Sequence, residues 1–134
     1  MTRRGSHPVG SSLALPILVL LAASAVEFGT FFRKYETIAA VAYAGAKAGA
    51  LADRDAVARA SAAAEDRWAD SELSGSLELA VSTGGPDGDR HVEVQATVEA
   101  APVFGLVALS PIPITCTRTV KIGRVHRVAL SPHP

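Results

Sequence analysis

The hydrophobic pattern of the chain begins with one long apolar run, Leu13 to Phe32, which contains a single charged residue, Glu27. Basic residues flank the run on both sides, at Arg4 and at Arg33. At 1.5 Å per residue, a helix of about 20 apolar residues is long enough to cross the hydrocarbon core of a bilayer. The pattern therefore predicts a transmembrane helix over this run, preceded by a basic leader over residues 1–12.

The run passes into a stretch rich in alanine and glycine that continues to about residue 52. This stretch contains no proline and consists largely of good helix formers, so we expect the same helix to continue through it. Small residues recur in it at intervals of three and four, at Ala42, Gly45, Ala46 and Gly49. Such spacing makes a smooth strip on which another helix can approach closely. Alanine-rich composition with good helix propensity is the alternative explanation.

A second helix is predicted from Ala56 to about Ala69, and either Asp53 or Asp55 is positioned to cap it. Its apolar face is expected to comprise Val57, Ala60, Ala64 and Trp68. We expect Trp68 to anchor the helix where it meets a sheet.

Alternating apolar and polar residues after Gly75 predict a small antiparallel sheet of three to four strands. The first strand begins near Leu77, and residues 91–100 alternate with valine and alanine on the inner face. Residues 84–89 between them have the composition of a turn rather than of a calcium loop, so the two strands form a hairpin. A further strand is predicted over residues 114–122.

Two features of this last part are unusual. The connection from Ala101 to Pro113 is too apolar for a free loop, so we expect it to pack over the sheet edge or against a partner. Arg118 falls among the apolar positions of the last strand, which requires a partner, a bulge or an exposed edge. Residues 53–123 are thus predicted to form a small extracytoplasmic α+β domain, followed by a tail over residues 124–134.

Three interpretations compete for the N-terminus: a retained anchor, a cleaved secretory signal and a soluble core helix. Ala23-Ser24-Ala25 fits the small-x-small rule for signal cleavage after Ala25. The apolar character nevertheless continues through Phe28 to Phe32, and a charged aromatic boundary then follows at residues 33–35. Such a boundary is typical of a membrane interface and favours the anchor. Without a second span, the protein would be single-pass, with its leader in the cytoplasm.

Glu27 is the exceptional residue of the span, because an acid inside a membrane helix is costly and points to a function. One hypothesis is that Glu27 pairs with a cation or a backbone donor on the helix of a neighbouring subunit. The alternative is that Glu27, about one turn from Phe32, reaches the level of the lipid headgroups.

The composition of the chain argues against several classes of function. The chain has 134 residues and a formal net charge of zero, which gives no reason to expect nucleic acid as a partner. Its single cysteine, Cys116, excludes an intramolecular disulfide and a multi-cysteine zinc site. The four histidines are scattered, and no phosphate loop or nucleophile motif is present. We therefore expect no enzymatic activity, no metal, no cofactor and no small-molecule substrate.

Several motifs in order resemble the TadE/TadG-like proteins of bacterial tight-adherence (Flp-type) pilus assembly. They are Arg4-Gly5-Ser6, the Leu-Pro step of Leu13–Pro16, Val26–Gly29, the Ala/Gly-rich stretch Ala44–Ala50, Val92–Val98, Pro102 and Pro111–Thr115. The resemblance covers roughly residues 3–123. It implies a pilin-like fold, with a long N-terminal transmembrane helix followed by a second helix and a small sheet.

The resemblance also implies a minor pseudopilin or membrane-anchored assembly component in the inner membrane. Its partners would be other pilins, pseudopilins and pilus assembly proteins, together with a prepilin peptidase that cuts between Gly5 and Ser6. The family's glutamate at the fifth mature position is replaced here by Gly10. The rival hypotheses are a secreted small domain released after Ala25 and a generic single-pass anchor with an outer binding domain.

Overall fold

The computed structural model describes residues 7–52, 54–86, 90–106 and 110–122, with side chains from Ser12 onward. Two helices are followed by three strands, which confirms the predicted α+β class. The elements are α1 (His7–Leu51), α2 (Ala56–Ala69), β1 (Leu77–Gly84), β2 (His91–Ala100) and β3 (Ile112–Lys121).

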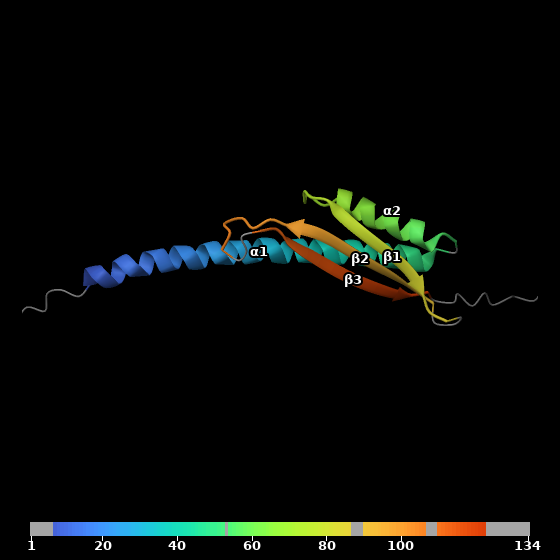
Figure 1. Cartoon of the computed structure of the whole chain (residues 1–134), viewed down its shortest axis with the longest axis horizontal. Coiled ribbons are helices and arrows are strands. Elements are labelled where there is room, and N and C mark those ends of the chain that lie inside the picture. Colours follow the sequence, from blue (N-terminus) through green and yellow to red (C-terminus); the bar gives the residue numbers. More distant parts are fainter. Residues whose placement is uncertain (1–6, 53, 87–89, 107–109, 123–134) are drawn as a thin grey trace, which may run out of the picture.

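Helix α1 is one continuous helix of 45 residues, which at 1.5 Å per residue is about 68 Å long. It runs nearly the full length of the molecule, and all the other elements lie along its second half (Figure 1). The helix begins at His7, so part of the predicted leader is helical. Pro8 is compatible with this start, because a helix makes no use of the N–H group at its first positions.

The three strands form one antiparallel sheet in the order β1-β2-β3. Leu77 pairs with Val98 and Gly84 with His91, which confirms the predicted hairpin. Both helices contact the sheet: α1 packs against β2 and β3, and α2 packs against α1 and β1. Helix α2 runs back along α1 in the opposite direction, so both helices and the sheet share one core (Figure 1).

The core lies between the inner face of β2 and the second half of α1. Every second side chain of β2 is fully or almost fully buried, as the alternation predicts: Val92, Val94, Ala96 and Val98. From α1, the buried side chains include Ile38, Val41, Ala42 and Ala46. These side chains are alanine, valine and isoleucine, and none of them is aromatic, so the helices and the sheet approach one another closely.

The closest approach is at the two glycines of the small-residue strip. A Cβ atom added at Gly49 would lie 2.9 Å from the carbonyl oxygen of Ala56 and 2.9 Å from the Cβ of Ala60. One added at Gly45 would lie 2.9 Å from the carbonyl oxygen of Ala60. Helix α2 of the same chain therefore lies directly on this strip, and the backbone of α2 leaves no room for a side chain.

Some details of the predictions are wrong. Val57 is exposed, and Ala56 packs against the core in its place, because the buried positions of α2 follow a spacing of four residues through Ala60 and Ala64. Asp55 stands at the N-cap with a left-handed backbone (φ 56°), but its side chain makes no capping hydrogen bond. Asp53, the other predicted cap, lies outside the described residues.

Arg118 takes one of the three arrangements expected for it. Strand β3 pairs with β2 in unbroken register from residue 112 to 121, with Arg118 opposite Val94, so no bulge displaces it. The side chain is exposed on an edge strand. An edge position lets a long cationic side chain reach water from an apolar register.

The contact at Gly49 predicts the effect of adding a methyl group there. Gly49→Ala should lower the free energy of unfolding by about 1–3 kcal/mol from overpacking, against a gain of at most about 1 kcal/mol in helix propensity. Unfolding by urea in detergent micelles, followed by the fluorescence of Trp68, would measure the change.

The matched control is Gly29→Ala in the same helix, because a Cβ at Gly29 would meet nothing within 4 Å. This variant should be as stable as the wild type or slightly more stable. Equal stability of the two variants would contradict the close packing of α2 on α1.

Candidate functional site

Most side chains in the first half of α1, residues 12–32, are not covered by other parts of the protein, and we call this part the bare half. Among the described side chains from Ser12 to Phe32, Glu27 alone is buried. Large apolar side chains such as Leu15 (69% exposed) and Phe28 (65% exposed) face outward. By length and composition this helix is able to cross a membrane, a criterion that signal sequences and core helices also meet. Its exposure argues against a core helix, because core helices bury their apolar side chains.

Glu27 is fully buried within this bare region, with 0% of its surface exposed. Its carboxylate accepts two hydrogen bonds from backbone N–H groups of the connection between β2 and β3. The backbone nitrogen of Phe104 lies 3.4 Å from Oε1 of Glu27, and the backbone nitrogen of Leu106 lies 3.1 Å from Oε2. A carboxylate removed from water needs such donors, because an unsatisfied buried charge is very costly.

The conformation of Gly105 explains how two donors reach one carboxylate. Gly105 lies between Phe104 and Leu106 and has a left-handed backbone, with φ of 68°. A left-handed residue turns the N–H groups on either side of it toward the same point, which makes a small concave anion-binding site. Glycine is the residue that takes this conformation without steric cost.

We call residues 101–106 the clasp segment, because they hold Glu27 on one side and are open on the other. The side chains of Val103, Phe104 and Leu106 are 54%, 55% and 43% exposed. The clasp segment contains no charged residue. It therefore adds an apolar surface beside the bare half of α1, rather than a polar edge to the domain.

The covered face of α1 extends past Glu27 into the apolar run. Ala23, Ser24 and Phe31 are partly buried and lie on the same helical face as Glu27. In Figure 1 the connection that follows β2 reaches further along α1 toward the N-terminus than α2 or the strands do. The folded domain and the predicted membrane span therefore overlap along the helix.

The remaining predicted site residues are placed as follows. The strip of Ala42, Gly45, Ala46 and Gly49 is buried under α2 and β2 of its own chain. Gly5 and Ser6, the residues at the implied leader cleavage, lie outside the described residues.

Pairing of Glu27 with a helix of another subunit stays a prediction, but its carboxylate already binds donors of its own chain. Those donors lie 77 and 79 residues further along the chain, which the local pattern around Glu27 does not indicate. In the sequence, the feature that points to such a contact is the apolar connection from Ala101 to Pro113, which contains Gly105.

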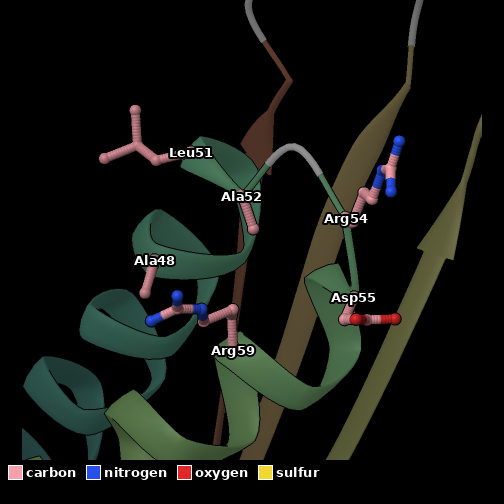
Figure 2. A pocket seen from close by; sticks show the side chains of 6 residues that line it. All are labelled: Ala48, Leu51, Ala52, Arg54, Asp55 and Arg59. Carbon is pink, nitrogen blue, oxygen red and sulfur yellow. The ribbon is translucent and has the colours of Figure 1, made fainter.

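A hollow at the junction of α1 and α2 carries charged side chains but no convergent site. Figure 2 shows Arg59 pointing across α1 toward Ala48, while Arg54 and Asp55 point to the opposite side. In the described part of the chain, no group of three histidine, cysteine or acidic side chains could hold a metal ion. Cys116 is a free thiol buried in the core.

No family model, curated protein or solved structure matches the chain. The bare helix and the bound glutamate are therefore the features from which a function is inferred.

The hydrogen bonds to Glu27 predict the exchange behaviour of the clasp segment. Glu27→Ala removes both acceptors, at a cost of about 1–3 kcal/mol for each unsatisfied donor, so the Phe104 and Leu106 amides should exchange roughly ten- to a hundredfold faster. Hydrogen–deuterium exchange of the full chain in micelles would measure this.

Glu36→Ala is the matched control, because Glu36 is an exposed acid on the same helix. It should leave exchange in the clasp segment unchanged. Equal exchange in wild type and Glu27→Ala would show that the carboxylate does not hold the segment.

Proposed function

We propose that the protein is a non-enzymatic, membrane-anchored component of a bacterial tight-adherence (type IV-like) pilus assembly or secretion system, of the minor pseudopilin kind. One observation carries the proposal: a single helix has a bare apolar half and a second half that serves as the floor of a small α+β domain. The resemblance of the sequence motifs to TadE/TadG-like proteins supports the same assignment.

The bare half of α1 suits both a free and an assembled state of such a subunit. In the free subunit, its outward leucines and phenylalanines would contact lipid, which requires an apolar surface of about 30 Å. In an assembly, the same surface would contact the equivalent helices of other subunits, and packing against them would replace packing against lipid. The strip of small residues takes no part in this, since α2 covers it.

The cations beside the apolar run support a span that ends at Arg33, but they do not choose its orientation. Arg33 and Lys34 follow the apolar run, where cations and aromatic residues would meet the headgroups. The leader would lie in the cytoplasm, and the domain would lie outside the inner membrane.

Cleavage after Gly5 would place Gly10 at the fifth mature position, so the chain would lack an acid to neutralise a neighbour's N-terminal amine. Glu27 is a poor substitute because it is buried and bound within its own chain. Both features favour a subunit that remains in the membrane.

Mass spectrometry of the mature N-terminus, on protein isolated from its own cell, tests the class of the protein. A start at Met1 is expected for a permanent anchor and a start at Ser6 for a processed pseudopilin. A start at Val26 would mean that a signal peptidase removes most of the bare helix, and would contradict the proposal.

Cross-linking in cells tests the partners. A photoreactive amino acid at Leu18, which is 66% exposed on the bare half, should capture pilin-type subunits or assembly proteins in the membrane fraction. The same group at Leu51, which is 76% exposed at the far end of α1, is the control and should not capture the same partners through a helix contact. A generic anchor would give no pilus-system partner from Leu18.

A further inference from the structure

We propose that the clasp segment, residues 101–106, inserts into the outer leaflet of the membrane beside α1, held there by Glu27. This inference rests on the proposed membrane placement of α1. The surface comprises Val103, Phe104 and Leu106, and its occupant is the hydrocarbon of the lipid chains. Glu27 acts as an internal fastener for this segment rather than as a contact between subunits.

The depth of the segment follows from its attachment point. Glu27 precedes Arg33 by six residues, which along a helix is about 9 Å on the apolar side of the first cation. Phe104 and Leu106 donate directly to Glu27, so their backbone lies at the same level. If Arg33 is at the headgroups, the clasp segment is below them.

The backbone of the segment is adapted to that depth. Irregular backbone at membrane depth is tolerated where its polar groups find partners within the protein. Pro102 has no N–H group, and the N–H groups of Phe104 and Leu106 are bound by Glu27. At three of the six residues of the clasp segment, the backbone nitrogen thus either lacks a hydrogen or donates to Glu27, and the acid finds these donors within its own chain.

The other side of the domain contrasts with the clasp segment. There the end of α2 meets α1 in a hollow that includes Arg33 and Thr37 from α1. Charged side chains from the α2 side, Asp70 and Glu72, line the same hollow. Among the described residues, the charged side chains of this hollow meet α1 at Arg33, whereas the uncharged clasp segment meets α1 at Glu27, six residues nearer the N-terminus.

Lipid is the occupant that these observations favour. The exposed apolar side chains of the clasp segment lie at about the depth of Phe28, which follows Glu27 in α1 and is 65% exposed. A surface of this kind at the depth of the acyl chains is covered by lipid in the free subunit without any partner. A second copy of the chain covering the segment is the competing outcome of the test.

Tryptophan quenching by brominated lipids in proteoliposomes tests the insertion. The full chain carries a single tryptophan, Trp68, in the domain, and this wild-type protein is the negative control. Two variants in a Trp68→Phe background move the probe, one with Phe104→Trp and one with Phe28→Trp. We expect Phe104→Trp and Phe28→Trp to lose emission to a comparable extent, most strongly with bromine near the headgroups. Trp68 of the wild type should be quenched least of the three.

The outcomes separate this inference from the proposed function. Quenching of Phe28→Trp without quenching of Phe104→Trp would leave α1 in the membrane and overturn the insertion. If Phe104→Trp were unquenched but shifted to the blue and dependent on protein concentration, a second copy would cover the segment. Absence of quenching in both variants would overturn the membrane anchor and the insertion together.

A second variant tests the fastening role of Glu27. Glu27→Ala, combined with Phe104→Trp, should reduce quenching of the clasp segment, because two backbone donors lose their acceptor in the apolar layer. Glu27→Ala combined with Phe28→Trp should leave the quenching of α1 unchanged. Persistent quenching at residue 104 without the carboxylate would show that Glu27 does not hold the segment in the membrane.

Discussion

The rest of this structure depends on the packing of one helix face, the buried side of α1 between Ile38 and Ala50. The three-stranded sheet and α2 bury their apolar side chains against this face, and α2 also packs against β1. Gly45 and Gly49 set the distance between the two helices, because α2 contacts them through its backbone. Since the same helix continues unbroken into the bare apolar half, the domain and the proposed anchor are joined by one continuous helix rather than by a linker.

Glu27 extends that connection past the core. A bare helix joined to a small domain at one end would leave the β2–β3 connection free, but the carboxylate binds two of its backbone N–H groups. One acid in an apolar helix thus stabilises a loop that is distant in sequence. The cost of burying an acid is offset by donors that would themselves be costly without a partner.

The sequence predicted those parts of the fold that depend on local periodicity. The alternation of β2 identified its buried residues, and the composition of the alanine-rich stretch identified α2 between Ala56 and Ala69. It did not identify the occupant of the small-residue strip as α2, nor the donors to Glu27, because both depend on contacts between distant segments. Val57 was misplaced because a shift of one residue on an alanine-rich helix hardly changes the pattern.

The central claim is that the bare half of α1 and the clasp segment share one lipid environment while the sheet stays outside it. Nuclear magnetic resonance of the isotope-labelled chain in nanodiscs containing a spin-labelled lipid would test this most directly. The account predicts that the amide signals of Leu13–Phe32 and of Val103–Leu106 broaden together, while those of β1 and β2 keep their intensity. Broadening of the helix alone, with the clasp segment as sharp as the sheet, would contradict it.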